Sequence, residues 1–362
     1  MTWLPMPHVL GGSRDALNYV KAIKSLGLRV PAVKLVNAMG QAGEFLAAGA
    51  ELIIGRPTRV DPSLGGEIHK NPVTEAQNYV RNFLGPHILA NPRVQVWEVW
   101  NEPTVGSEAE MLWLVAFCAN AARVLSVEFG RAGVHLNFST GNPELKYMRL
   151  MRPLLEAIRR YGGYIGMHEY ANKPHIVNGQ IQYGAMMGQP WSLLGRQKLI
   201  NAIWAEQGYF NVPVIVTEGG LDRTEPGAYA FRDEGNVYSA RDYAALAGAY
   251  HDYMVAACPN VVAWTIFTWG TDSDGWRNHN VDETGFAGEL VAQAKLRVSQ
   301  KPEPLFEFDG TGLTVDLFNA PDGLFMRRVK DIKVIHVWDK RPGWWRVTTH
   351  WWMRRVSLKA AV

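Results

Sequence analysis

The chain has 362 residues, of which 47% are hydrophobic and 20% are charged, and its formal net charge is +3. This length suits one (β/α)8 barrel with a small appended domain, and the composition is that of an ordinary globular protein. Residues 1–300 carry 26 Lys/Arg and 27 Asp/Glu, whereas the remaining residues carry 11 and 7. A neutral main body argues against a nucleic-acid groove, which needs a basic surface, and no uninterrupted apolar run is long enough for membrane insertion.

Strand-like apolar runs alternate with helix-like segments eight times before residue 300, which predicts an α/β fold, a closed parallel TIM barrel. The predicted strands are residues 8–10, 32–36, 51–56, 94–101, 134–140, 164–170, 214–218 and 261–269. Two helices between them are clear: residues 13–26, with a serine cap, and residues 239–257, an Ala-rich amphipathic run. We expect the helix after the fifth strand to break at Pro153.

The predicted loops differ in length on the two ends of this barrel. Connections that return to a strand are short, as at residues 27–29, 162–163 and 259–260. Connections that leave a strand are long and rich in polar and aromatic residues, at residues 57–71, 171–190, 219–238 and 270–285. Because the leaving connections form one face of a barrel, the sequence predicts a substrate cleft there.

After a KPEP linker the pattern changes to short β-type segments without helices. The segments GLFMRR, IKVIHVW, GWWRVTT and WWMRRVSL have hairpin-like spacing and resemble a bacterial SH3-like module. We therefore predict a catalytic barrel over residues 1–300 and a small all-β domain over residues 301–362. This domain would either contact a cell wall or glycan or be a packing module that caps the barrel, with many of its tryptophans in its own core.

Cys118 and Cys258 are the only cysteines, and their apolar helical surroundings predict buried thiols rather than a disulfide or a metal site. No HExxH, EF-hand or phosphate-binding glycine loop occurs, and the DSDG segment at residues 272–275 lacks a downstream ligand. We expect no cofactor and no metal. The N-terminal segment MTWLPMPHVLGG shows no signal peptide, so the localisation stays open.

Two apolar strands end in carboxylates. The segment VQVWEVWNEP, residues 94–103, contains Glu102, and VIVTEGG, residues 214–220, contains Glu218. Both runs are of the kind that a parallel sheet buries on both faces. Two glutamates at strand ends indicate acid-base chemistry at the rim of the barrel.

NEP at the end of the fourth strand, TEG at the end of the seventh and an aromatic at the end of the eighth together resemble the retaining glycoside hydrolases of the (β/α)8 clan A. The resemblance implies cleavage of β-glycosidic bonds by double displacement, with Glu218 as nucleophile and Glu102 as acid/base. This chemistry needs two carboxyl groups about 5 to 5.5 Å apart. Burial and the second carboxylate would keep Glu102 protonated, while Glu218 stays ionised.

The same resemblance assigns roles to residues around this pair. Asn101 would donate a hydrogen bond to the sugar 2-hydroxyl, and Tyr170 would hold Glu218 through a hydrogen bond. Period-2 alternation in MHEY puts His168 on the same side as Tyr170, so His168 would line the same subsite. Arg56, at the end of the third strand, would supply a cation near the nucleophile.

Aromatic residues provide candidate sugar platforms. By resemblance, Trp269 at the end of the eighth strand would lie under the sugar that is cleaved, whereas Trp264 would belong to the core. Trp276, together with Trp191 and Tyr183, lies in the long loops and would form outer subsites or anchor those loops.

A third glutamate, Glu98, lies on the fourth strand with the same parity as Glu102. At about 3.3 Å per residue it would lie roughly 13 Å deeper in the barrel. We therefore expect Glu98 to be a buried ion-pair partner rather than a catalytic residue.

The sequence therefore predicts a retaining β-glycosidase that acts on an oligo- or polysaccharide, with cleavage within the polysaccharide as the weaker part of the prediction. Two alternatives stay open: a peptidoglycan lysin anchored by the SH3-like tail, and a non-catalytic carbohydrate-binding barrel. The second alternative would have no use for two facing carboxylates.

Overall fold

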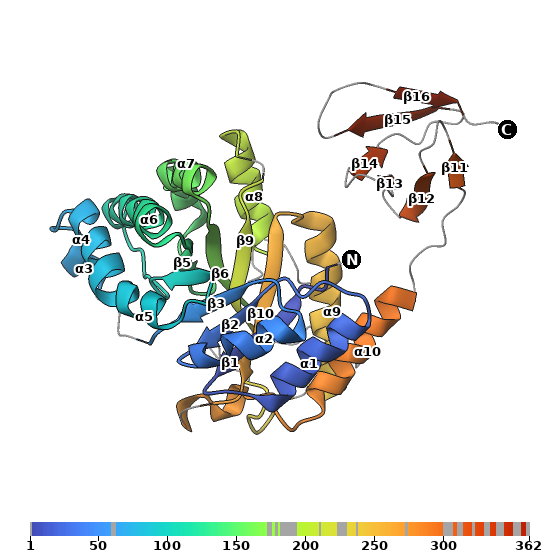
Figure 1. Cartoon of the computed structure of the whole chain (residues 1–362), viewed down its shortest axis with the longest axis horizontal. Helices are drawn as coiled ribbons and strands as arrows, with labels where there is room; N and C mark the ends of the chain where they lie inside the picture. The colour runs from blue at the N-terminus through green and yellow to red at the C-terminus, as the bar shows by residue number, and fades with distance from the viewer. Residues whose placement is uncertain are drawn as a thin grey trace. The chain divides into compact units, whose positions relative to one another are not determined.

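The computed structural model describes residues 2–58, 63–171, 194–209, 211–222, 230–236, 238–271 and 274–299, and also the backbone of several short strands beyond them. Eight parallel strands close into a barrel in the order β1-β10-β9-β6-β5-β4-β3-β2 (Figure 1). Their bounds are β1 Pro5–Leu10, β2 Val33–Val36, β3 Ile53–Arg56, β4 Val96–Val99, β5 Ala132–Phe138, β6 Tyr164–Ala171, β9 Val214–Leu221 and β10 Val261–Trp269. The predicted TIM barrel is confirmed.

The ends of two strands differ from the prediction in ways that matter for the rim. Strand β4 ends at Val99 rather than at Asn101, because Trp100 and Glu102 have φ values of +64° and +50°. A strand cannot continue through such left-handed conformations. Strand β9, in contrast, continues to Leu221, beyond Glu218.

The helices lie outside the strands, with α1 and α10 side by side (Figure 1). The α-helices are α1 Arg14–Ser25, α2 Ala42–Ala48, α3 Leu64–Glu67, α4 Pro72–Asn78, α5 Gly85–Ala90, α6 Glu108–Phe129, α7 Arg152–Tyr161, α8 Gln197–Glu206, α9 Ala240–Ala257 and α10 Phe286–Ser299. Between them lie the 3-10 helices η1 Met39–Gln41, η3 Leu145–Met151 and η4 Asp274–His279, and the π-helix η2 Tyr79–Leu84.

Local sequence explains several helix ends. The Ser13 side chain caps α1 by accepting from the Ala16 amide, and Ser239 and Asp242 form a capping box at the start of α9. Pro153 lies in the first turn of α7, directly after η3. The missing N–H of a proline is tolerated there, so the expected break appears as a helix boundary.

The barrel interior is apolar at one level and polar at the next. The apolar level is a cluster of six buried residues, of which five lie on strands and Ala32 lies directly before β2: Ala32, Ile54, Val96, Val134, Ile215 and Ala263. Two residues further along four of these strands, toward their carboxyl ends, lie the buried polar residues Lys34, Glu98, Thr217 and Thr265. Because alternate residues of a strand share a face, these four side chains form the next layer inside the barrel.

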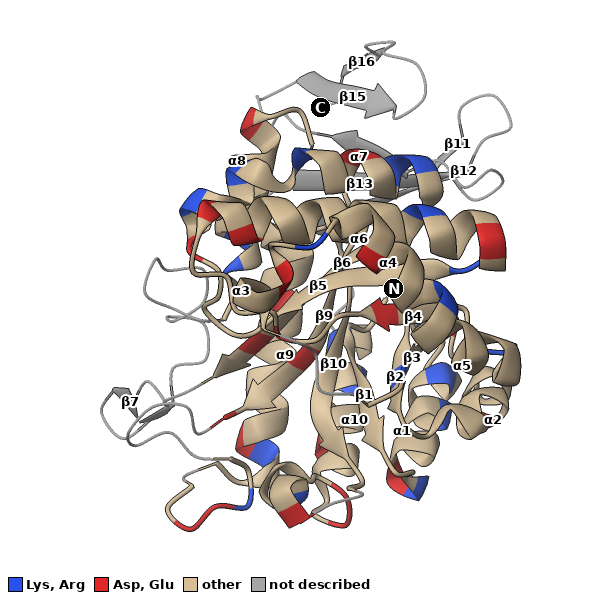
Figure 2. Cartoon of the chain, turned by 90° about the vertical axis from the view of Figure 1, so that its left-hand side faces the viewer, with Lys and Arg blue, Asp and Glu red and all other residues tan. Residues whose placement is uncertain are grey.

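Helix α6 is long and apolar enough to cross a bilayer by length and composition alone, and half of its most apolar window is buried. It packs against β5, α4 and α7 as one of the barrel helices. Cys118 on α6 and Cys258 after α9 are buried free thiols, as predicted. Figure 2 shows basic and acidic residues interspersed along the helices that face the viewer.

Contacts divide the chain into two units, Met1–Lys295 and Leu296–Val362. In the second unit, strands β11 Glu307–Asp309, β12 Thr314–Ala320, β13 Gly323–Arg328, β14 Val334–Val337, β15 Trp344–Thr349 and β16 Val356–Lys359 pair in sequential antiparallel order. Strands β7 Ile176–Val177 and β8 Gln180–Ile181 pair separately. The domain boundaries and the SH3-like module stay predictions.

Candidate active site

Glu218 points into the barrel because strand β9 contains a bulge. Met167 of β6 pairs with Val216, but the next residue, His168, pairs with Glu218. Thr217 is thus the extra residue of a β-bulge, with no partner of its own on β6. The bulge interrupts the alternation of side chains between the two faces of β9. Thr217 and Glu218 therefore both have partners inside the barrel, although they are neighbours in sequence.

The Glu218 carboxylate is buried and is contacted on both oxygens. Its Oε1 lies 3.0 Å from Lys34 Nζ and 2.7 Å from Arg56 Nη1. Its Oε2 accepts a hydrogen bond of 3.1 Å from the Tyr170 hydroxyl and lies 3.6 Å from His168 Nδ1. Arg56, His168 and Tyr170 therefore lie beside Glu218, where the sequence placed them.

The surroundings favour the ionised form of Glu218. Burial alone would raise the pKa of this carboxyl, but the positive groups around it, His168 first and then Lys34, outweigh burial and hold the pKa well below its usual value. Burial and the Glu218 carboxylate together raise the pKa of Tyr170 well above its usual value. The Tyr170 hydroxyl therefore stays protonated and donates a hydrogen bond to Glu218.

Glu102 lies on the turn that follows β4. Its amide donates a 3.0 Å hydrogen bond to the Asn137 carbonyl, and its carboxylate Oε1 lies 2.9 Å from His168 Nδ1. The Glu102 side chain is 46% exposed, so the prediction that it is buried is wrong. The physical reason is the left-handed turn, which takes Glu102 out of the strand and toward solvent.

One imidazole nitrogen connects the two predicted carboxylates. His168 Nδ1 lies 2.9 Å from Glu102 Oε1 and 3.6 Å from Glu218 Oε2. These two oxygens therefore lie no farther apart than the sum of the two distances, about 6.5 Å, which is the lower limit for inverting glycosidases. This upper bound excludes the wider spacings of inverting glycosidases and allows a spacing of about 5 to 5.5 Å.

Glu98 forms the predicted ion pair, but its predicted depth is wrong. Lys34 Nζ lies 2.7 Å from Glu98 Oε2 and 3.0 Å from Glu218 Oε1, so one ammonium bridges the two carboxylates. Arg56 also reaches both, with its Nε 3.5 Å from Glu98 Oε1. Counting along a straight strand fails because β4 ends early, and because Glu98 extends into the layer that also holds Lys34.

Lys34 was missed by the sequence reasoning, although a signal for it exists. It is the one charged residue in the apolar strand AVKLV and is completely buried. A lysine is almost never fully buried unless it is paired. A charge inside a buried strand therefore indicates that a carboxylate faces it.

Replacing Lys34 by methionine is expected to lower the free energy of unfolding by about 3 to 5 kcal/mol at neutral pH, because the substitution leaves two buried carboxylates with Arg56 as the cation that they share. Since folding lowers the pKa of Glu218, its ionised form stabilises the protein at pH values above its ordinary pKa of 4.5, and this contribution is lost as the pH falls through the folded-state pKa. The difference between wild type and Lys34→Met should therefore shrink in acid, as measured by denaturant unfolding at a series of pH values.

The double variant Lys34→Met/Glu98→Gln is the matched control for this prediction. It removes one positive and one negative charge, so its loss of stability should be smaller than the sum of the two single losses. A Lys34→Met effect that is independent of pH would contradict the proposed link to Glu218.

Within the described residues, Glu98, His168 and Glu218 also form a group that could hold a metal ion, with ligand atoms within 4.8 Å of one another. Lys34 and Arg56, however, already contact both carboxylates. A cation would have to displace these two side chains or lie beside them. The arrangement therefore suits ionised carboxylates paired with side-chain cations better than it suits a metal.

Trp269 does not lie at the position that was expected for a sugar platform. Its side chain is completely buried, stacks on Tyr19 of α1 with ring centroids 5.2 Å apart, and packs against Phe286 of α10. The prediction that Trp269 lies under the sugar is wrong. A shift in register between β1 and β10 beside Trp269 breaks the alternation, so Trp269 packs against the outer helices.

Phe267 reaches the site from β10 instead. Its ring lies 4.9 Å from that of His8 and 6.4 Å from that of Tyr170, the residue bonded to Glu218. Trp276 packs edge-on against Phe267 at 5.2 Å, and 47% of Trp276 is exposed. The Phe267 ring therefore lies between the exposed Trp276 indole and the Tyr170 ring and contacts both. Trp264 is buried against Tyr250, as predicted.

Asn101 is half-buried between Trp100 and Glu102, on the turn after β4. Three further predicted positions, Tyr183, Trp191 and Asp272, lie outside the described residues. The structure describes only part of the predicted loops 171–190 and 219–238, which follow β6 and β9.

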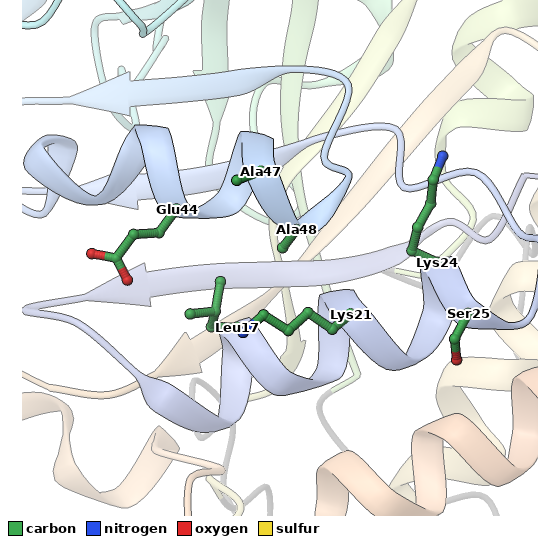
Figure 3. A pocket seen from close by; sticks show the side chains of 7 residues that line it. All are labelled: Leu17, Lys21, Lys24, Ser25, Glu44, Ala47 and Ala48. Atoms are coloured by element: carbon green, nitrogen blue, oxygen red, sulfur yellow. The ribbon is translucent and has the colours of Figure 1, made fainter.

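A groove on the surface between α1 and α2, with a volume of about 530 Å³, is not part of this site (Figure 3). Its lining residues are Leu17, Lys21, Lys24, Ser25, Glu44, Ala47 and Ala48. Glu44 is the only carboxylate among them. The groove therefore cannot support chemistry that needs two carboxyl groups.

No family model matches the chain, and no curated protein matches it. A solved glucosidase from Croceicoccus marinus is similar in structure, with a TM-score of 0.51 and 12% identity over 100% of this chain and 81% of that chain. A family 51 α-L-arabinofuranosidase from Bifidobacterium longum has a TM-score of 0.47 and 11% identity over 90% of this chain and 75% of that chain. The catalytic domain of the Thermobifida fusca endoglucanase Cel5A has a TM-score of 0.43 and 14% identity over 83% of this chain and 91% of that chain. The first similarity shows that the chain shares its fold with a (β/α)8 glycoside hydrolase.

Proposed function

We propose that the chain is a retaining glycoside hydrolase that cleaves β-glycosidic bonds. The observation that carries this proposal is the pair of carboxylates on either side of His168, whose nearest described oxygens lie at most about 6.5 Å apart. Their environments differ, because one carboxylate is buried among cations and the other faces solvent.

Glu218 is the proposed nucleophile. Its Oε1 is held by Lys34 and Arg56, whereas Oε2 lies on the side of His168 and Glu102. We therefore assign the attack to Oε2. This oxygen forms a bond to the anomeric carbon while the glycosidic C–O bond breaks, and Glu102 gives its proton to the departing oxygen.

The second displacement uses the same groups in reverse. A water molecule gives a proton to the Glu102 carboxylate, its oxygen bonds to the anomeric carbon, and the ester to Glu218 breaks. The exposure of Glu102 suits both steps, since this group must meet a leaving group first and a water molecule afterwards. Asn101, on the same turn, is the proposed partner of the sugar 2-hydroxyl.

We propose Trp276 in place of Trp269 as the aromatic that a sugar contacts. Trp276→Ala is expected to raise KM about five-fold, since an aromatic contact contributes about 1 kcal/mol, and to leave kcat nearly unchanged. Because Trp276 is half-exposed, thermal unfolding should change little.

Trp269→Phe is the matched control for Trp276→Ala. It alters a tryptophan that is completely buried and stacked on Tyr19, so it should lower the thermal stability and leave KM unchanged. An unchanged KM in Trp276→Ala would contradict the assignment of Trp276.

The proposed function is tested by incubating the full chain with β-glucans, β-mannans, β-galactans and purified cell walls. The anomer of the first product is then detected by proton NMR. We expect a β-anomer that mutarotates later, which is the result of retention. Release of an α-anomer would exclude the double displacement, and loss of turbidity with cell walls alone would favour a peptidoglycan substrate. Oligosaccharides of mixed length would indicate cleavage within a polysaccharide.

A further inference from the structure

We infer that Asn137, together with Thr217, positions the turn that carries Glu102 relative to the strand that carries Glu218. This inference deepens the proposed function and rests on it for its consequence in catalysis. Asn137 lies on β5, is completely buried and was not singled out by the sequence. It is a positioning residue, because none of its described contacts is with a reacting carboxylate oxygen.

The Asn137 side chain closes the end of strand β4. Its Nδ2 donates to the carbonyl of Trp100 at 2.8 Å and lies 3.3 Å from the carbonyl of Val99. The backbone carbonyl of Asn137 accepts the 3.0 Å hydrogen bond from the Glu102 backbone amide. Asn137 therefore binds the turn on both sides of Asn101, at Val99 and Trp100 and again at Glu102.

The other end of the same amide reaches strand β9. Asn137 Oδ1 accepts a 3.0 Å hydrogen bond from Thr217 Oγ1, and Thr217 immediately precedes Glu218. Strand β6 lies between β5 and β9 in the barrel, so the amide must cross it. Gly166 makes this crossing possible, since a Cβ atom there would lie only 1.9 Å from Asn137 Oδ1.

Backbone geometry shows why an asparagine suits this position. Leu136 and Asn137 have φ values of +82° and +41°, and the register between β5 and β6 shifts between His135 and Phe138. Asparagine tolerates the left-handed region better than most residues do. The irregular backbone turns its amide into the barrel, where one side chain supplies both a donor for β4 and an acceptor for β9.

The separation of the two carboxylates therefore depends on a short series of links. Asn137 is hydrogen-bonded to the turn that carries Glu102 and to Thr217, and Thr217 is the residue before Glu218 in the chain. A loosened turn would misplace the proton donor more than it would misplace the nucleophile, since β9 is held on both sides by barrel strands. Positioning errors of this size lower rates strongly even when the reacting groups are intact.

The test compares Asn137→Asp with wild type on aryl β-glycosides that have phenol or 2,4-dinitrophenol as the leaving group. Phenol needs a proton from Glu102, whereas 2,4-dinitrophenol leaves without one. We expect kcat/KM to fall by about 100-fold for the phenyl substrate and by less than about 10-fold for the dinitrophenyl substrate. Equal losses for the two leaving groups would overturn the inference.

Thr217 supplies a second, milder test that does not depend on the folding of Asn137→Asp. Thr217→Val removes the hydroxyl that donates to Asn137 Oδ1 at 3.0 Å and lies 3.4 Å from the Met167 carbonyl. It should show the same dependence on the leaving group, with a smaller effect. Thr217→Ser restores the hydroxyl and should restore the wild-type ratio. A Thr217→Ser ratio equal to that of Thr217→Val would overturn the inference.

Hydrogen exchange separates failure of this inference from failure of the proposed function. If wild type cleaves no aryl glycoside, the glycosidase proposal fails, but the Glu102 amide can still be followed by NMR. Its exchange should be at least ten-fold faster in Asn137→Asp than in wild type, because its acceptor carbonyl is displaced. Unchanged protection of this amide would overturn the positioning role.

Discussion

Replacing Glu218 by alanine is expected to lower turnover by about 10⁴-fold or more, because it removes the proposed nucleophile. The substitution leaves a small space beside Lys34 and Arg56, and two cations favour an anion there. Added azide should therefore restore activity and yield the α-glycosyl azide, since azide attacks from the side where Glu218 stood. The product is identified by NMR.

Glu98→Gln is the matched control, because Glu98 contacts the same two cations. This variant should be destabilised, but azide should neither accelerate it nor be incorporated into the product. Full activity of Glu218→Ala, or an α-glycosyl azide from Glu98→Gln, would refute the assignment of the nucleophile.

Glu102→Ala is expected to lose about 10²- to 10⁴-fold in kcat on substrates that need protonation, which is the usual contribution of a general acid. On 2,4-dinitrophenyl glycosides the first step should proceed nearly normally, and breakdown of the ester to Glu218 should become rate-limiting. A burst of dinitrophenol followed by a slow phase is the signature of this change.

Azide again distinguishes the two carboxylates. In Glu102→Ala it should attack the ester that Glu218 forms and give the β-glycosyl azide, the anomer opposite to that expected from Glu218→Ala. Glu102→Gln keeps the hydrogen-bonding shape next to His168 without the acid and should show the same burst. An α-azide from Glu102→Ala would show that the two roles are exchanged.

The positions of Arg56, His168 and Tyr170 beside Glu218 were accessible from the sequence, because each lies at or near the end of an apolar strand. Lys34 was accessible in principle, as a charge inside an apolar strand. The error at Trp269 has a different origin. In an ideal strand its side chain would point into the barrel, but the shift in register beside it is a property of the pairing between β1 and β10.

The sequence alone determined the eight-stranded barrel and the two strand-end motifs, because apolar periodicity, caps and turn residues act over a few neighbouring positions. Only the tertiary structure decided how the two motifs meet. The bulge at Thr217 turns Glu218 inward, the left-handed turn exposes Glu102, and the Asn137 amide joins them across Gly166. These features depend on hydrogen bonds between residues that are 35 to 80 positions apart in the chain, and no local pattern of side chains specifies such bonds.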